Sequence, residues 1–174
     1  MRRKKFTAEE EAILLDPNAD PVDRHSAIAC MRSDNLRLHE VLVLSFLDDP
    51  SEYLRSAALQ TAVHWDARTY LPLLGQRMLQ DPSEVVRGES AISAWWVVKN
   101  FPDTKETILP WLARMADRDE CPPNRFGAYE HFIDLVSEGA ESFNALQRGL
   151  DPDRDIDRAR LQPYLDADPT PLLH

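Results

Sequence analysis

The sequence predicts an all-α chain built from about five repeated helix pairs. Three observations lead to this fold class. An arginine that mostly follows an Asp-Pro pair recurs about every 32 residues, small or apolar residues follow it with helical spacing, and the chain has 13 prolines but only 5 glycines. Scarce glycine argues against a protein rich in tight β-hairpins, whereas proline suits the first turn of a helix.

The repeat is clearest in DPSEYLRSAAL, which begins at Asp49, and in DPSEVVRGESAI, which begins at Asp81. The motif recurs at five arginines with spacings of 31, 32, 38 and 33 residues: Arg24, Arg55, Arg87, Arg125 and Arg158. Four of them follow an Asp-Pro pair, and the fourth in order follows Pro122-Pro123 instead. The residues three and seven positions after each arginine share one side of a helix and are mostly apolar or small. Each arginine therefore marks a helix with one buried face.

An apolar helix precedes each of these helices. The five predicted first helices are TAEEEAILL, LRLHEVLVLSFL, RTYLPLLGQRML, KETILPWLARMA and ESFNALQRGL. The predicted unit is therefore helix, turn, helix, and the repeats span residues 7–33, 36–66, 67–100, 103–138 and 139–165. Residues 166–174 form a C-terminal tail, and the whole chain is expected to be one repeat domain.

The Asp-Pro turn has a structural explanation. Proline has a fixed φ and no N–H, so it fits the first turn of a helix, and an aspartate before it can accept free backbone N–H groups. Ser51 and Ser83 are expected to add further capping oxygens. The arginine of one unit is expected to reach the aspartate of an adjacent turn. We therefore interpret the Asp and Arg series as scaffold and not as catalytic groups.

The motif D-P-x-x-x-[hydrophobe]-R-x-x-[small] is similar to the HEAT repeat, in particular to the short bacterial repeats of phycobilisome-lyase-type HEAT-like proteins. The resemblance is good in residues 49–66 and 81–98, fair in 16–33 and weak in 119–136 and 151–165. It implies a right-handed α-solenoid, a HEAT-like superhelix of about five helix pairs whose second helices line the concave side. It also implies a protein that binds other molecules, since such repeats mostly do so.

Residues of the second helices that lie outside the core stripe would then face the groove. They stand two, five, six and nine positions after each aligned arginine, and Gly127 and His131 are among them. The predicted partner-binding residues are Gln60, His64, Glu89, Ile92, Ser93, Trp96, Glu130 and Asp134. The acidic members would attract a partner and Trp96 would anchor it, because tryptophan is enriched at binding hot spots. Two plainer explanations stay open: Trp95 and Trp96 pack between repeats, and Glu130 and Asp134 belong to a solvated helix face.

Composition disfavours several classes of function. The net charge of −10 opposes generic nucleic-acid binding. Cys30 and Cys121 have no zinc-type spacing, and no phosphate-loop, dinucleotide, nucleophile-elbow or zincin motif occurs. The basic start MRRKK precedes too short an apolar run for a signal peptide, and no stretch approaches a membrane span. We therefore expect a cytoplasmic monomer with no catalytic residues, cofactor or metal.

The first functional hypothesis is a non-enzymatic adaptor that binds a basic protein in its concave groove. Its size and charge also suit an immunity or antitoxin protein that inhibits a basic toxin. The alternative is a HEAT-like enzyme of the bilin-lyase or DNA-glycosylase kind. A glycosylase needs a positive concave surface, which the charge opposes. The single pair His39-Glu40 excludes the iron site of HEAT-like deoxyhypusine hydroxylases, which needs several His-Glu pairs.

Overall fold

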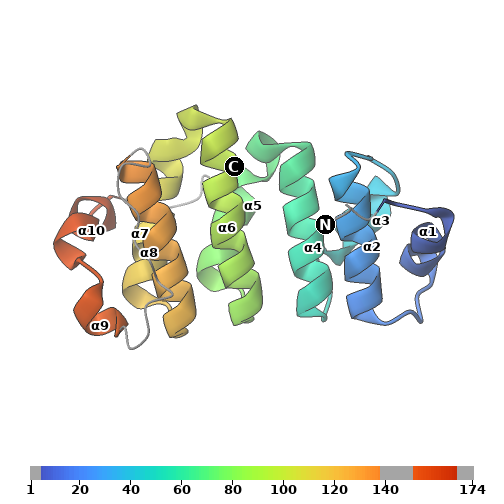
Figure 1. Cartoon of the computed structure of the whole chain (residues 1–174), viewed down its shortest axis with the longest axis horizontal. Coiled ribbons are helices and arrows are strands. Elements are labelled where there is room, and N and C mark those ends of the chain that lie inside the picture. The colour runs from blue at the N-terminus through green and yellow to red at the C-terminus, as the bar shows by residue number, and fades with distance from the viewer. Residues whose placement is uncertain (1–4, 138–150, 168–174) are drawn as a thin grey trace. The chain divides into compact units, whose positions relative to one another are not determined.

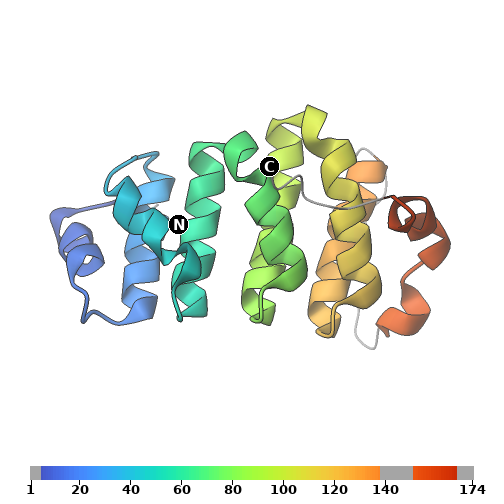
Figure 2. The same ribbon diagram turned by 180° about the vertical axis from the view of Figure 1, so that it is seen from behind.

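The computed structural model describes residues 5–137 and 151–167 of the chain (Figures 1 and 2). Within these residues there are ten α-helices and two 3-10 helices, and no strand occurs. The predicted all-α class is therefore confirmed. The chain divides into two compact units between Tyr70 and Leu71, at a point inside one helix, α5 (Ala67–Gln80).

The first unit is built around two helices that pack against each other, α2 (Pro21–Ser33) and α4 (Glu52–Trp65). The short α1 (Ala8–Leu15) packs on α2, and α3 (Glu40–Ser45) with the 3-10 helix η1 (Phe46–Asp48) packs on α4. The core of this unit includes Leu14, Ile28, Met31, Val43 and Leu54, each at most 2% exposed. These side chains come from four different helices, so apolar burial joins the unit.

The helix predicted from LRLHEVLVLSFL is shorter than expected. It begins only at Glu40. The preceding residue, His39, has a left-handed backbone conformation with φ 51°, so a regular helix cannot continue through it toward the N-terminus. The His39 Nε2 atom lies 2.6 Å from Glu11 Oε1, which holds the ring against α1. From Phe46 onward the chain continues as η1.

The second unit contains the rest of α5, α6 (Glu84–Asn100), η2 (Pro102–Thr104), α7 (Lys105–Arg118) and α8 (Pro122–Val136). Two short helices follow, α9 (Pro152–Asp155) and α10 (Arg158–Leu165). Helix α8 packs on both α6 and α7, and α10 packs on α7. Trp111 and Phe132, at 2% and 0% exposed, are the largest side chains of this core. The α6–α8 contact brings together the two helices that carry most of the candidate site.

The Asp-Pro turns are Asx turns, in which the aspartate accepts a hydrogen bond from the N–H two residues later. The N–H of Ser51 donates to Asp49 at 2.8 Å, and that of Ser83 donates to Asp81 at 2.9 Å. Asp119, which lacks a following proline, accepts from Cys121 N in the same way, at 2.8 Å. The aspartate therefore accepts a backbone N–H as expected, and in α4 and α6 this is the N–H of the N-cap serine.

Two details of the predicted turn were wrong. Ser51 and Ser83 are the N-cap residues of α4 and α6, but neither makes a side-chain cap hydrogen bond. Pro50 and Pro82 stand just before these N-caps and not in the first helical turn, whereas the first-turn position holds for Pro21 of α2. The Asx turn explains why each proline lies outside the helix. The aspartate carboxylate binds the N–H of the serine, so the turn closes around the proline and the helix begins only after the serine.

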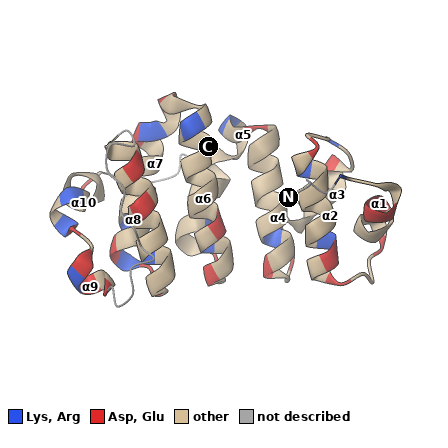
Figure 3. Cartoon of the chain, in the orientation of Figure 1, with Lys and Arg blue, Asp and Glu red and all other residues tan. Residues whose placement is uncertain are grey.

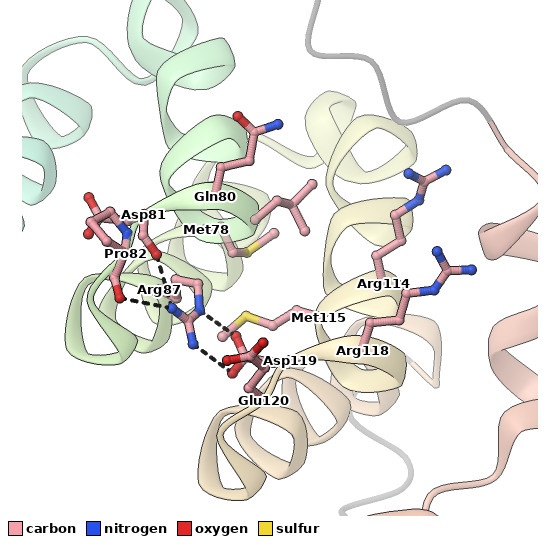
Figure 4. A pocket seen from close by; sticks show the side chains of 11 residues that line it. Met78, Gln80, Asp81, Pro82, Arg87, Arg114, Met115, Arg118, Asp119 and Glu120 are labelled. Atoms are coloured by element: carbon pink, nitrogen blue, oxygen red, sulfur yellow. Dashed lines mark hydrogen bonds and ion pairs between the residues drawn. The ribbon is translucent and has the colours of Figure 1, made fainter.

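The arginines bind the turns as predicted. Arg87 Nη1 donates to the carbonyl oxygen of Asp81 at 3.0 Å, inside its own turn. Its Nε and Nη2 atoms donate to the two carboxylate oxygens of Asp119, at 2.7 and 3.1 Å, across 32 residues (Figure 4). Arg125 Nη1 likewise donates to Asp153, at 2.9 Å. The expectation that an arginine reaches the aspartate of an adjacent turn is confirmed for Arg87, whereas Arg125 binds Asp153 in the first turn of α9 and not the turn aspartate Asp151.

The end of the chain differs from the predicted last pair. The first helix expected there, ESFNALQRGL, lies outside the described residues. The second helix is broken into α9 and α10 at Ile156, which is extended and only 4% exposed. Asp157 begins the new helix, since its side chain accepts from Ala159 N and its own N–H donates to the Tyr129 hydroxyl oxygen at 3.3 Å. Burial of Ile156 thus interrupts the helical pattern.

Candidate protein-binding groove between α6 and α8

A groove of about 570 Å³ lies between α6 and α8 in the second unit. From α6 it is lined by Glu84, Val85, Gly88, Glu89, Ala91 and Ile92. From α8 it is lined by Pro123, Asn124, Gly127, Ala128, Glu130 and His131. Both helices carry acidic residues along the ribbon (Figure 3). Three of the eight predicted binding residues, Glu89, Ile92 and Glu130, line this groove.

The phase of α6 explains why apolar side chains remain open to solvent here. Val86 and Ala94, at 1% and 0% exposed, belong to the core stripe. Val85 and Ile92 lie on a different stripe, seven residues apart, and are 40% and 48% exposed. Two large aliphatic side chains on one helical stripe therefore stand at an open groove instead of in the core.

The floor of the groove is narrow at one end and open further along. A Cβ atom added to Gly88 would lie 2.6 Å from Asn124 Oδ1. The same asparagine donates from Nδ2 to the carbonyl oxygen of Glu84 at 2.8 Å, so it ties α8 to the start of α6. By contrast, a Cβ atom added to Gly127 would meet nothing within 4 Å. The groove therefore has free space directly above the backbone of α8.

The charge of the lining is negative. It contains three glutamates, Glu84, Glu89 and Glu130, and no lysine or arginine among its residues. Burial lowers the pKa of His131, although the charge of Asp134 opposes this effect, so burial favours the neutral imidazole. Because no cation lines the groove, we expect a negative potential along it.

Beyond the groove, Asp134 belongs to a cluster with its own cation. Its Oδ2 atom accepts a hydrogen bond from Trp95 Nε1 at 2.6 Å and lies 2.7 Å from Lys99 Nζ. These two hydrogen bonds, that of Lys99 first, lower the pKa of Asp134. The Trp95 ring stacks on His131 with centroids 5.6 Å apart, and Lys99 Nζ lies 5.5 Å from the Trp95 ring centroid.

This cluster changes what can be expected of two predicted residues. Lys99 compensates the charge of Asp134, so this carboxylate adds little to the field of the groove. The tryptophan that joins α6 to α8 is Trp95, whereas Trp96, the predicted anchor, is half-buried and does not line the groove. Ser93 does not line it either, and its hydroxyl donates to the carbonyl oxygen of Glu89 at 2.9 Å within α6.

The remaining two predicted residues lie on α4, in the first unit. Gln60 Nε2 donates to Ser56 Oγ at 3.1 Å, and His64 Nε2 lies 3.3 Å from Asn35 Oδ1. Both side chains are half-buried. The structure thus gathers three predicted residues in one groove and places the other five elsewhere.

Sequence reasoning missed Val85 and Asn124 as groove residues. A signal for Val85 was present, because it stands one helical turn before Glu89 on the stripe that continues to Ile92. Asn124 directly precedes Arg125, which the sequence analysis interpreted as part of the scaffold. The hydrogen bond from Asn124 to Glu84 spans 40 residues, so no nearby sequence pattern could predict it.

A second hollow, of about 560 Å³, is a part of the turn scaffold (Figure 4). It is centred on Arg87 and Asp119, whose side chains are 15% and 3% exposed. The hydrogen bond that Arg87 donates to Asp119 raises the pKa of Arg87. With both charges bound to each other, this arginine supports the turns and is a poor candidate for ligand binding.

The described residues contain neither a metal-binding cluster nor a membrane-spanning helix. They hold no group of three or more His, Cys, Asp or Glu side chains that could bind a metal ion. No helix among them has both the length and the apolar character that crossing a membrane requires. Comparison of the chain with protein-family models, with curated proteins and with solved structures found no match in any of the three.

Proposed function

We propose that this protein is a non-enzymatic interaction module that binds a basic segment of a partner protein in the groove between α6 and α8. The observation that carries the proposal is the composition of the lining. Exposed aliphatic side chains, Val85 and Ile92, stand beside three glutamates, and the lining has no lysine or arginine. A segment that combines apolar side chains with lysine or arginine complements both properties.

The repeat supports the wider form of the proposal. The arginine period and the HEAT-like motif favour a solenoid of helix pairs, in which second helices form a continuous binding side. In that arrangement α6 and α8 supply the central part of the side. An adaptor, or an inhibitor of the immunity or antitoxin type with a basic target, would use such a side with the chain's net charge of −10.

The charges and the apolar groups are expected to act on different rates. Glutamates at a groove rim mainly speed association, and salt weakens their effect. Ile92, which is buried only when the groove is occupied, mainly slows dissociation. Removing its exposed aliphatic surface from water contributes about 1–2 kcal/mol at roughly 25 cal/mol per Å².

The test uses a synthetic peptide of leucine and lysine and a counterpart with glutamate in place of lysine. Amide chemical shifts of the 19.9 kDa chain locate the bound peptide. We expect shifts in residues 84–92 and 123–131 with the basic peptide only. Shift changes centred on another helix would show that the groove is not the binding surface.

Surface plasmon resonance at two ionic strengths then tests the roles of the side chains. Glu89→Lys with Glu130→Lys should slow association about 10-fold and flatten its salt dependence. Ile92→Ser should instead speed dissociation. Glu9→Lys with Glu106→Lys, which makes the same total charge change at two exposed sites outside the groove, should leave association nearly unchanged. Equal losses in this control and in the groove variant would mean that net charge, and not the groove, attracts the peptide.

A further inference from the structure

We infer that the segment bound in the groove is an amphipathic α-helix whose backbone passes close to Gly127; this inference rests on the proposed function and names its partner's conformation. It begins from a difference among the three described glycines. Packing within the protein requires a glycine at position 75, because an added Cβ would lie 2.7 Å from the Trp111 ring. The same holds at Gly88, where an added Cβ would lie 2.6 Å from Asn124 Oδ1.

No packing contact within the protein requires a glycine at position 127. Gly127 lies in the interior of α8, where glycine is less favourable than alanine by about 1 kcal/mol. Its Cβ would enter open space, and that space is the groove. Glycine at a helix interior without an internal contact is explained by the close approach of another backbone.

The walls of the groove favour a helical occupant over an extended one. The N–H and C=O groups in the middle of α6 and α8 are used within each helix, so they cannot form a ladder with an added strand. Asn124 also uses its side-chain amide on Glu84. An extended segment buried here would leave its own backbone groups without partners, whereas a helix satisfies them internally.

The distribution of side chains defines the partner helix further. Its apolar stripe would lie on Val85 and Ile92, and small residues of that stripe would pass over Gly127. Glu89 and Glu130 come from opposite walls, so lysines or arginines on both flanks of the stripe would meet them. The groove is lined by residues 84–92 of α6 and 123–131 of α8, about 12 Å of each helix, which two to three turns of a partner helix would cover.

The test compares two peptides of about 14 residues with identical composition and charge. One carries leucine and alanine at helical spacing with lysine on both flanks. The other is its isomer with D-residues at every third position, which cannot form a regular helix. Binding is measured by isothermal titration against wild-type protein, Gly127→Ala, Gly127→Leu and Thr107→Leu. Thr107→Leu adds the same side chain at an exposed site on α7 that does not line the groove.

We expect the helical peptide to bind wild type at least 10-fold more tightly than the D-isomer does. Gly127→Leu should weaken its binding at least 10-fold, Gly127→Ala less than about 3-fold, and Thr107→Leu should have no effect, with unchanged helical circular dichroism in all variants. Equal binding of the two peptides, both blocked by Gly127→Leu, would overturn the helical partner but leave the proposed groove intact. Binding of either peptide that ignores Gly127→Leu, or no binding at all, would overturn both.

Discussion

Gly127 and Gly75 form a matched pair whose replacement by alanine should change stability in opposite directions. Both are glycines in helix interiors of the second unit, in α8 and α5. Alanine raises helix stability over glycine by about 0.8–1.0 kcal/mol at such positions. The two sites differ in what a new methyl group would meet. The pair therefore separates the effect of helix propensity on stability from the effect of side-chain packing.

At Gly127 the methyl group meets nothing within 4 Å. The free energy of unfolding of Gly127→Ala should therefore rise by nearly the full propensity gain, about 0.8 kcal/mol. At Gly75 the methyl carbon would lie 2.7 to 2.9 Å from three atoms of the Trp111 ring. That ring is 2% exposed and cannot move aside, so overpacking of about 1–3 kcal/mol exceeds the gain. Gly75→Ala should therefore destabilise by up to about 2 kcal/mol.

The assay is urea unfolding followed by far-UV circular dichroism, with an m value shared among the variants. A rise for Gly127→Ala and a fall for Gly75→Ala would show that only Gly75 is needed by the fold. If Gly127→Ala lowered the free energy of unfolding by more than about 0.5 kcal/mol, the glycine would serve the fold itself, and the argument for a closely approaching partner would fail.

Three further predictions concern charged groups of the second unit. Arg87→Ala should lower the free energy of unfolding by about 2–4 kcal/mol, because it leaves the 3% exposed Asp119 side chain without its cation. If urea unfolding showed that this free energy falls by less than about 1 kcal/mol, the prediction would be contradicted. Burial lowers the pKa of His131 despite the facing Asp134, so the unfolded chain binds this proton more readily than the folded chain does. The contribution of His131 to the free energy of unfolding should therefore be fully present above the ordinary pKa of 6.5 and should fall as the pH drops through that value. His131→Asn should flatten that loss in urea unfolding between about pH 7.5 and 5.5, and an unchanged profile would assign it to other groups. Lys99→Met should raise the pKa of Asp134 toward its ordinary 3.8, measured by carboxyl NMR titration, and a pKa that stays low would leave the Trp95 hydrogen bond as its cause.

The helices themselves could be predicted because their signals are local. The aspartate of each turn, the arginine four to seven residues later and the small residues of the buried stripe act largely within one helix and its cap. The apolar pattern of the first helices was enough to place α1, α5 and α7 within a residue or two of their observed bounds. It was not enough for α3, since nothing in LRLHEVLVLSFL shows that His39 adopts a left-handed conformation against Glu11, 28 residues earlier.

The candidate site could be predicted only in part for the same physical reason. Helical phase grouped Glu89, Ile92 and Glu130, and these three residues line one groove; their role in binding a partner stays a prediction. Phase says nothing about which charges are neutralised by distant residues, so Asp134 was expected to attract a partner although Lys99, 35 residues away, compensates it. Trp95 and Trp96 differ by about 100° around α6, and the contacts with His131 and Asp134 show that Trp95 is the one that faces α8.

The repeat also explains why the groove is acidic. Arg87 and Glu89 are two residues apart, so their side chains leave α6 about 200° apart, on opposite sides of the helix. The arginine points to the turns, where Asp119 binds it, and the glutamate points to the groove. In α8, Arg125 is bound at Ala116 and Asp153, while Glu130 remains exposed. Turn chemistry thus uses these two arginines on one side of each helix and leaves carboxylates on the other. The positions of Glu89 and Glu130 in the lining are therefore a consequence of the helical phase of the scaffold, and the proposed basic partner would complement their charge.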